Sequence, residues 1–232
     1  MAMQEFFSEN TNPNLVEIVK VTKIYPPDVV ALRNVSLSAR KGELVFLTGP
    51  SGSGKTTLLK LLCRIETPTR GLIEIGGKDL SSLKPNDIQQ LRQRIGVAYQ
   101  DFRLLPRQSV FDNIAMPMEV CFTNPKEIRE RVMELLAKLA LTEKQNKPAG
   151  KISRGEQQRV AIARAAANAP PLILADEPTG NLDAVTTGLV MNLFNELNQR
   201  GSTIIIATHD ESIYRETSHR KFELRQGEMQ EL

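Results

Sequence analysis

A glycine-rich stretch holds the residues best suited to bind phosphate groups. Residues 49–56 have the sequence GPSGSGKT, which matches G-x-x-x-x-G-K-[ST] and lies between the apolar runs LVFLT and TLLKLLCRI. Glycines let backbone N–H groups approach phosphate oxygens, and the start of a following helix adds positive potential. We predict a phosphate-binding loop in which Lys55 supplies a positive charge and Thr56 offers its hydroxyl to Mg²⁺. The residues expected to bind the phosphates are Gly49, Pro50, Ser51, Gly52, Ser53, Gly54, Lys55, Thr56 and Thr57.

Two adjacent carboxylates follow a second apolar strand, with the sequence PLILADE over residues 171–177. Asp176 lies at the carboxyl end of this strand, where open α/β sheets bind ligands, and we predict that it holds Mg²⁺ through water. Glu177 comes one residue later, near the γ-phosphate, where a carboxylate can act as the general base that orients water. A simply solvated acid at a strand end remains the alternative for Glu177.

His209 follows a third apolar run, STIIIAT. From the end of that strand its imidazole can hydrogen-bond a γ-phosphate, so it joins Lys55 and Glu177 as a candidate catalytic residue. A structural or exposed histidine is the alternative. His219 lies in a polar stretch without such a frame, and we assign it no role.

An Ala- and Arg-rich helix is predicted to begin at residues 153–156 and to continue to about Ala167. Ser153 and Glu156 fit the S-x-x-E capping box. Gly155 lowers helix propensity in the first turn, which is useful where another group must approach the backbone closely. The helix start therefore suits an anion, although a well-capped helix without a ligand remains an alternative.

The segments around these motifs predict an α/β fold with a mainly parallel core sheet and an antiparallel β flank. Residues 15–25 and 31–39 favour two antiparallel strands around Pro26-Pro27-Asp28, and residues 72–80 favour a hairpin through Gly76-Gly77. The apolar runs at 44–48, 172–175 and 203–208 are typical of parallel strands buried on both faces.

Helical patterns are concentrated between the first two core strands. Apolar residues at Ile128, Val132, Leu135, Leu136 and Leu139 recur at helical spacing. These helical stretches together are longer than one crossover connection between two parallel strands needs. We therefore predict a helical subdomain at about 85–168 that is inserted into a single domain of residues 15–232. Residues 1–14 are predicted to form a flexible tail.

Composition excludes several classes of protein. With 232 residues, 41% hydrophobic and 25% charged, the chain has ordinary globular usage, which rules out wholesale disorder, collagen and coiled coil. A net charge of +3 without a basic cluster favours no nucleic-acid partner. No apolar run reaches the roughly 20 residues of a membrane span. Cys63 and Cys121 are predicted to be buried free thiols.

Taken in order, these motifs resemble the nucleotide-binding subunits of ABC transporters from about Leu15 to Gly227. The resemblance implies the P-loop ABC ATPase fold and assigns roles to residues that are weak signals alone. Tyr25 corresponds to the aromatic that stacks on adenine, and Gln100 to the Q-loop glutamine that also contacts the metal. The other matches are the signature (Ser153, Arg154, Gly155, Glu156), the Walker B acids (Asp176, Glu177), the D-loop (Asn181, Leu182, Asp183) and the switch histidine (His209).

The same resemblance implies ATP hydrolysis with ATP and Mg²⁺ bound. It also implies a head-to-tail dimer of two copies, in which each ATP lies between the phosphate loop of one copy and residues 153–156 of the other. Hydrolysis then opens the interface, and Gln100 and the helical subdomain pass the movement to a membrane partner. A nucleotide switch or kinase would leave Gln100, His209 and the signature helix without roles, and a DNA-repair ATPase would need a coiled-coil or zinc-bearing insertion that the chain lacks.

Within the family, the segments YQDFRLLP (99–106) and ADEPTGNLD (175–183) are most similar to the FtsE branch. That branch acts in bacterial cell division with the integral membrane protein FtsX, which implies a peripheral location on the cytoplasmic face of the inner membrane. The LolD lipoprotein-release ATPases and the MacB export systems share part of these segments and remain alternatives. Residues 101–103 favour the FtsE branch.

Arg154 departs from the family pattern, which usually has glycine there. The side chain can point to solvent, obstruct close approach, or add a cation near the γ-phosphate. We expect slower basal turnover than in an Arg154→Gly variant, and a weakly active ATP-binding scaffold remains an alternative function.

Overall fold

The computed structural model describes residues 13–232, and the chain forms two compact units. One unit contains the residues up to Arg92 together with Ile205–Leu232, and the other contains Gln93–Ile204. Most of the tail predicted at residues 1–14 lies outside the described residues, and Asn14 already belongs to the first strand.

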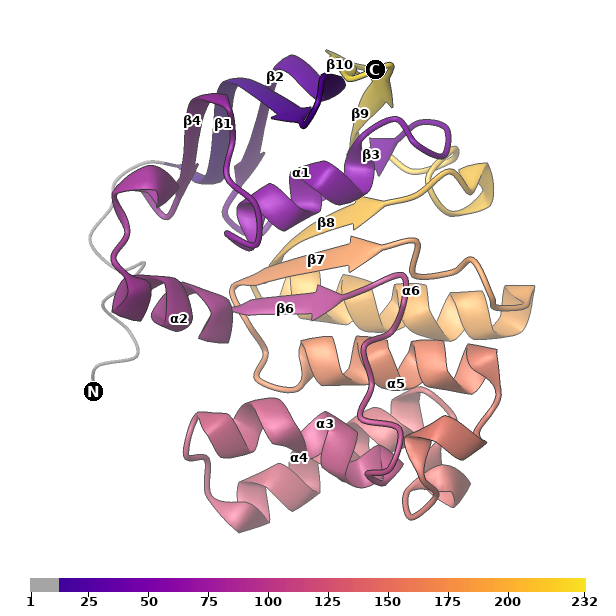
Figure 1. The fold of residues 1–232 in the computed structure, drawn as a ribbon. Helices are drawn as coiled ribbons and strands as arrows, with labels where there is room; N and C mark the ends of the chain where they lie inside the picture. The colour runs from indigo at the N-terminus through magenta and orange to yellow at the C-terminus, as the bar shows by residue number, and fades with distance from the viewer. Residues whose placement is uncertain (1–12) are drawn as a thin grey trace. The chain divides into compact units, whose positions relative to one another are not determined.

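An antiparallel sheet occupies the N-terminal part of the first unit (Figure 1). β1 (Asn14–Tyr25) pairs with β2 (Val29–Arg40) and with β4 (Arg70–Ile75), which in turn pairs with the short β5 (Lys78–Asp79). The register joins Tyr25 to Val29 across the Pro26–Asp28 turn and Ile75 to Lys78 across the two glycines. Both predicted hairpins are therefore confirmed.

A second strand group in the first unit leads into the phosphate loop. β3 (Leu44–Thr48) is fully buried and pairs in parallel with β9 (Arg220–Arg225), which forms a hairpin with β10 (Glu228–Glu231). α1 (Lys55–Leu62) follows the loop. The unit also contains the short helix η1 (Leu80–Ser82), most of α2 (Pro85–Gln93) and η4 (Glu211–Ile213).

The second unit contains another parallel pair, β6 (Ile95–Ala98) with β7 (Leu172–Asp176). α5 (Arg154–Ala166) packs tightly on β6, because a Cβ added to Gly96 would lie 2.0 Å from the Ala165 carbonyl oxygen. α6 (Ala184–Gln199) follows β7, and β8 (Thr203–Ala207) is fully buried and carries the chain back to the first unit. Buried parallel strands are thus confirmed at 44–48 and 172–175, and residues 203–207 form a strand that is buried throughout.

A helical region precedes α5 in the second unit. It contains α3 (Val110–Val120), α4 (Pro125–Lys138) and the short helices η2 (Thr142–Lys144) and η3 (Ala149–Lys151). The amphipathic prediction is confirmed, since the five apolar residues that it named are buried, four within α4 and Leu139 as its C-cap. Arg131 ties α4 to α5 by donating to the carbonyl oxygens of Ala166 and Ala167 at 3.0 and 3.3 Å.

The two cysteines are free thiols, as predicted, but they differ in burial. Cys63 is buried at the end of α1. The prediction of burial is wrong for Cys121, which is only half-buried because it caps the exposed end of α3. Between residues 13 and 232, none of the helices combines the length and apolar character that a bilayer crossing requires.

Candidate nucleotide site

Lys55 is folded onto its own loop in the first unit. Its Nζ donates hydrogen bonds to the carbonyl oxygens of Gly49 (2.7 Å) and Pro50 (3.1 Å), and the residue is only 5% exposed. The ammonium group of this first residue of α1 is thereby held against the start of the loop 49–54. A point charge in this position suits an incoming phosphate.

Two glycines of the loop cannot be replaced without displacing the backbone. Gly49 and Gly54 have φ angles of +132° and +111°, which L side chains rarely adopt. A Cβ at Gly49 would lie 2.1 Å from the Leu224 carbonyl oxygen, and one at Gly54 would lie 2.5 Å from that of Ala31. The loop therefore needs glycine both for its turn and for its close contact with neighbouring strands.

Ser53 carries the observation that best tests whether the loop fits a phosphate ligand. Its Oγ is buried and has no hydrogen-bond partner among the described residues. Buried polar groups are normally paired, so this hydroxyl suits a ligand oxygen. Thr56, on the first turn of α1, is exposed and open to a metal-bound water. The residues of the loop therefore fit a polyphosphate and its cation.

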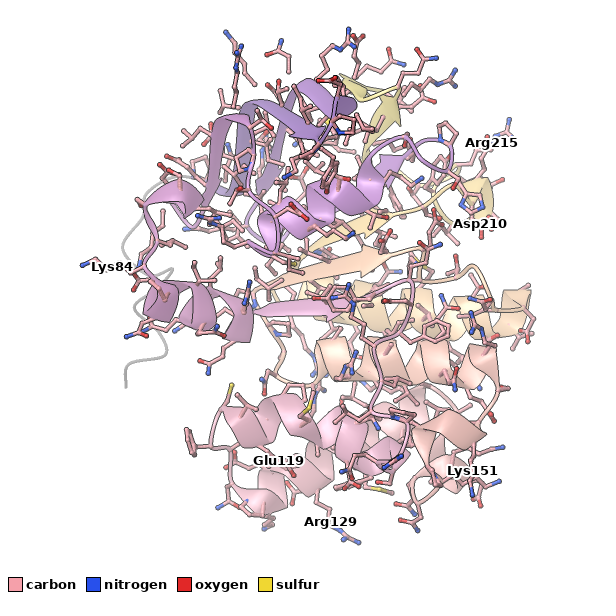
Figure 2. All side chains as sticks on the ribbon, in the orientation of Figure 1. Lys84, Glu119, Arg129, Lys151, Asp210 and Arg215 are labelled. Atoms are coloured by element: carbon pink, nitrogen blue, oxygen red, sulfur yellow. The ribbon has the colours of Figure 1, made fainter. Side chains whose placement is uncertain are left out.

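Tyr25 and His209 also belong to the first unit. Tyr25 ends β1 half-buried, and its ring lies 4.7 Å from Lys23 Nζ, which is itself held by Glu66 at 2.8 Å. His209 is exposed just after β8, where the N–H of Thr208 donates to the Leu47 carbonyl oxygen at 3.0 Å. This bond places His209 beside the end of β3, which continues into the phosphate loop. Figure 2 labels Asp210 and Arg215 in the segment that follows.

The start of α5, in the second unit, has the predicted capping box. The Glu156 N–H donates to Ser153 Oγ at 3.3 Å, and the Ser153 N–H donates to a Glu156 carboxylate oxygen at 2.8 Å. Lys144 lies 2.8 Å from the same carboxylate. The hydrogen bond from Lys144, supported by Ser153, lowers the pKa of Glu156 to about 2. Glu156 therefore stays charged at the helix start.

Arg154 is exposed and reaches a residue far away in the sequence. Its guanidinium carbon lies 5.4 Å from the centre of the Phe102 ring, in the range of a cation–π contact. The side chain is therefore exposed and lies along the surface of its own chain, against the segment that follows Gln100, a contact that the sequence did not predict.

Arg164 holds that same segment from the other end of α5. Its guanidinium donates to the carbonyl oxygens of Phe102 (2.6 Å) and Arg103 (2.7 Å), which both have left-handed φ angles of +61° and +47°. Burial is the main cause that lowers the pKa of Arg164. The Arg103 guanidinium lies 4.0 Å from the Tyr99 ring centre. Gln100, between these anchored residues, is exposed.

The two adjacent carboxylates differ in setting. Asp176 is buried at the end of β7, whereas Glu177 is half-buried and has a φ of +49°. Gln158 of α5 donates to the Glu177 carbonyl oxygen at 2.7 Å, a contact that the sequence analysis missed. The only sign of this contact in the sequence is that Gln158, a polar residue, lies just before the apolar part of α5.

The D-loop acid begins α6. Asp183 accepts a hydrogen bond from the Thr186 N–H at 2.8 Å and is the N-cap of that helix. This bond is the main reason that the pKa of Asp183 lies below its ordinary value. Asn181 and Leu182 complete the turn between Glu177 and α6, and the Asn181 carbonyl oxygen lies near Gly155 of α5. Within the second unit, the structure thus brings the Walker B, D-loop and signature segments together.

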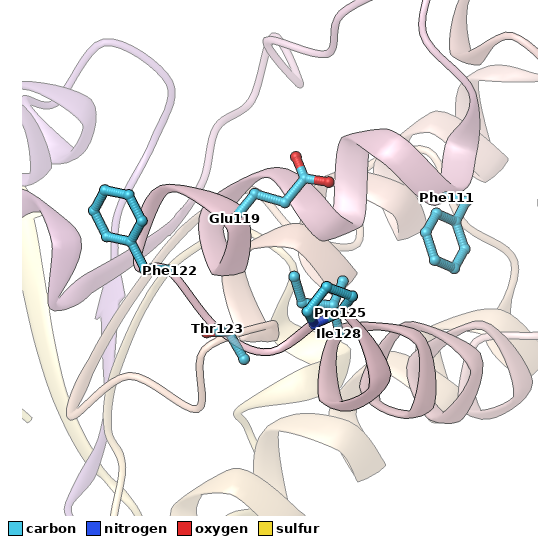
Figure 3. A pocket seen from close by; sticks show the side chains of 6 residues that line it. All are labelled: Phe111, Glu119, Phe122, Thr123, Pro125 and Ile128. Atoms are coloured by element: carbon cyan, nitrogen blue, oxygen red, sulfur yellow. The ribbon is translucent and has the colours of Figure 1, made fainter.

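A pocket at the turn between α3 and α4 lies outside these predicted site residues (Figure 3). Phe122, one of the residues that line the pocket, is 95% exposed. The residues that line the pocket are Phe111, Glu119, Phe122, Thr123, Pro125 and Ile128.

Comparison with known proteins places this geometry in a family. The family model described as ABC transporter matches residues 32–180. The cell division ATP-binding protein FtsE of Bacillus subtilis (strain 168) is 43% identical over 213 residues, which cover 92% of this chain and 93% of the relative. FtsE of Escherichia coli (strain K12) is 41% identical over 215 residues, which cover 93% and 97%.

Solved structures agree with the sequence relatives. The chain is similar to the ATP-binding cassette MJ0796, described as a dimer in a post-hydrolysis state bound to ADP and Pi, with a TM-score of 0.87 and 36% identity over 94% of this chain and 98% of that one. It is also similar to cbiO1 of Clostridium perfringens, part of the ABC transporter complex cbiONQ, with a TM-score of 0.81 and 29% identity over 94% and 88% of the two chains. The chain therefore belongs to the ABC transporter family, as an ATP-binding subunit of the FtsE type.

Proposed function

We propose that the chain binds and hydrolyses ATP as one half of a two-fold dimer and drives an integral membrane subunit resembling FtsX in bacterial cell division. The FtsE relatives support this function over lipoprotein release or MacB-type export. The structural observation that carries the proposal is the phosphate loop. There a buried lysine donates to two loop carbonyls, and the buried Ser53 hydroxyl has no hydrogen-bond partner within residues 13–232.

The phosphate loop binds one face of the nucleotide. Lys55 exchanges its contacts with the loop carbonyls for β- and γ-phosphate oxygens, and the backbone N–H groups of residues 49–57 bind the remaining oxygens. Tyr25 stacks on the adenine, which its half-exposed ring at the end of β1 permits. His209 hydrogen-bonds the γ-phosphate.

Thr56, Gln100 and Asp176 are the residues that would hold Mg²⁺. A hydroxyl, an amide oxygen and a carboxylate form the oxygen donor set that this cation prefers, and phosphate oxygens complete it. Bound Mg²⁺ supplies neutralisation of the charge that develops on the β- and γ-phosphates.

Glu177 acts as the general base. Its carboxylate accepts a proton from the attacking water and orients that water for in-line displacement of the γ-phosphate. Lys55 stabilises the charge on the phosphate oxygens while the bond to the leaving group lengthens. The side chain of Glu177 is half-buried, which leaves it accessible to water.

The other face of each nucleotide is bound by residues 153–156 of a second copy. The α5 N-terminus presents N–H groups and a macrodipole that favour an anion. Dimerisation of the related MJ0796 cassette supports this arrangement. Loss of the γ-phosphate removes the bridge between the copies, so hydrolysis opens the dimer.

The membrane partner binds near Gln100 and the helical subdomain at about 85–168, inserted in the ATPase domain of 15–232. Residues 99–103 follow β6, and Arg164 holds the carbonyl oxygens of Phe102 and Arg103, which favours a defined surface for a partner. The chain then lies on the cytoplasmic face of the inner membrane, as a peripheral subunit.

Substitution of Glu177 tests the function directly. Glu177→Gln should bind ATP, lose hydrolysis by roughly 100-fold or more, and accumulate as an ATP-bound dimer, which size-exclusion chromatography with light scattering measures. Lys55→Ala should lose ATP binding and dimerisation together. Glu130→Gln, an exposed acid on α4, is the matched control and should behave as the natural chain.

The outcomes separate the ATPase from a non-catalytic scaffold. A scaffold would bind ATP and dimerise but show the same negligible hydrolysis in the natural chain and in Glu177→Gln. The proposal is contradicted if the Glu177→Gln variant hydrolyses ATP as fast as the natural chain. It is also contradicted if this variant binds ATP but stays monomeric.

A further inference from the structure

The side chain of Gln158 bridges the turn that leads from the Walker B acid Glu177 to the D-loop residue Asn181. The carboxamide of Gln158 donates from Nε2 to the Glu177 carbonyl oxygen at 2.7 Å and accepts through Oε1 from the Asn181 N–H at 3.1 Å. The residue is 3% exposed. Both polar ends of one buried amide are therefore used to close the turn 177–181.

The chemistry of the two partners fixes the orientation of the amide. A carbonyl oxygen only accepts and a backbone N–H only donates, so Nε2 must face Glu177 and Oε1 must face Asn181. An apolar group at either end, or an acceptor-only group in place of Nε2, would leave a polar backbone group without its bond.

The contact acts on a backbone that needs support. Glu177 has a φ of +49°, a left-handed conformation that is unfavourable for a residue other than glycine. The bond from Gln158 reaches the carbonyl of this same residue. Because the Cα–Cβ direction follows the backbone, a change in the backbone at Glu177 would move its side chain.

The neighbouring residues of α5 face the same turn. A Cβ on Gly155 would lie 3.1 Å from the Asn181 carbonyl oxygen, and the charge of Arg159 contributes to the lowered pKa of Asp183 after the main effect of Thr186. Positions 155, 158 and 159 are spaced i, i+3, i+4 and share one helix face. The first half of α5 therefore lies along the turn that carries Glu177.

We propose that Gln158 is a positioning residue for ATP hydrolysis, which holds the Glu177 backbone in its left-handed conformation and so aims the carboxylate at the attacking water. This role rests on the proposed function, in which Glu177 is the general base. Gln158 also connects α5 to Glu177. In the proposed dimer the start of α5 binds the nucleotide of the second copy, whereas Glu177 acts on the nucleotide of its own copy.

Gln158→Met tests the role, because methionine keeps the length and removes both hydrogen bonds. Gln157→Met is the matched control, since Gln157 is the neighbouring residue of α5 and also bonds a backbone carbonyl, that of Ala149 at 2.9 Å. In the purified full chain, Gln158→Met should lower kcat on the order of 10- to 100-fold with KM within about twofold, whereas Gln157→Met should stay near the natural rate.

Gln158→Glu gives a second readout if the methionine variant folds poorly. A glutamate donates to the Glu177 carbonyl only when it is protonated, and burial raises the pKa of such a group. The ATPase rate of Gln158→Glu relative to the natural chain should therefore fall as the pH rises from about 6 to about 9. A pH profile parallel to that of the natural chain would contradict the inference, since a merely structural defect does not titrate.

A double-mutant cycle with Glu177→Gln separates the two proposals. If Gln158 acts through Glu177, adding Gln158→Met to Glu177→Gln should not lower the residual single-turnover rate further. An additional loss of about 10- to 100-fold, or a loss in Gln158→Met no larger than in Gln157→Met, overturns the positioning role and leaves the proposed function intact. Undiminished hydrolysis in Glu177→Gln alone overturns the proposed function instead.

Discussion

The guanidinium of Arg154 lies against the ring of Phe102, 5.4 Å from its centre, although the two residues are 52 positions apart. The contact joins the start of α5 to the segment that follows Gln100. An arginine at the signature position is thereby held on its own chain, beside the helix start that the proposed dimer presents to a nucleotide.

Removal of this side chain should speed up basal turnover. We expect Arg154→Gly to raise the steady-state ATPase rate about fivefold, because the lost cation–π contact is worth ~1 kcal/mol and the backbone N–H groups become more accessible. A phosphate-release assay on the purified chains measures the rate. Arg154→Lys, which keeps charge and bulk, should stay near the natural rate, and equal rates for the glycine variant and the natural chain would sink the prediction.

Arg164 should be needed to keep residues 102 and 103 ordered. Arg164→Lys replaces a planar donor by a point charge, so the two carbonyl bonds at 2.6 and 2.7 Å cannot both be kept. We expect a loss of about 2–3 kcal/mol in the free energy of unfolding and faster amide hydrogen exchange at residues 101–104. Arg129→Lys, on an exposed arginine of α4 (Figure 2), should change neither quantity, and unchanged exchange in Arg164→Lys would refute the role.

Glu156 should make stability depend on pH. Its pKa of about 2 in the folded chain lies below the ordinary 4.5, so the unfolded chain binds a proton more readily. The stabilisation is complete above the ordinary pKa and disappears as the pH falls through the folded pKa. Urea unfolding should therefore show the natural chain about 1–2 kcal/mol more stable than Glu156→Gln at pH ~7, and the gap should narrow by pH ~3. A gap that is constant with pH would mean that the carboxylate charge does not contribute.

The segment 101–103 should decide which membrane subunit binds. Replacement of Asp101 and Arg103 by alanine removes the exposed charges but keeps the backbone that Arg164 holds. We expect co-purification with the FtsX-like subunit to fall at least about tenfold while ATP binding is unchanged. A complex recovered in full yield would contradict the proposed docking surface.

Local signals predicted the phosphate loop, the capping box of Ser153 and Glu156, both N-terminal hairpins and α4. Each depends on residues close together in the sequence, such as glycines before a lysine or apolar positions at helical spacing. The hairpin of β9 and β10 had a comparable signal, the Gln226-Gly227 turn, which was missed.

Contacts between distant residues could not be predicted in the same way. β6 has only four residues, and its partner β7 comes far later in the chain, so no local pattern marks it as a strand. The bond from Gln158 to Glu177 depends on how α5 packs after folding. The left-handed backbone of Phe102 follows from the carbonyl bond to Arg164, since phenylalanine does not favour it.

The capping box already satisfies two backbone donors at the start of α5, the N–H groups of Ser153 and Glu156, before any second copy arrives. Ser153 and Glu156 bond each other, and Lys144 neutralises the carboxylate. At these two donors an approaching anion must exchange existing hydrogen bonds for new ones of similar strength, which makes the net gain from them small. Such an exchange favours a dimer that dissociates quickly. Fast dissociation is required if the two copies must separate in every hydrolysis cycle.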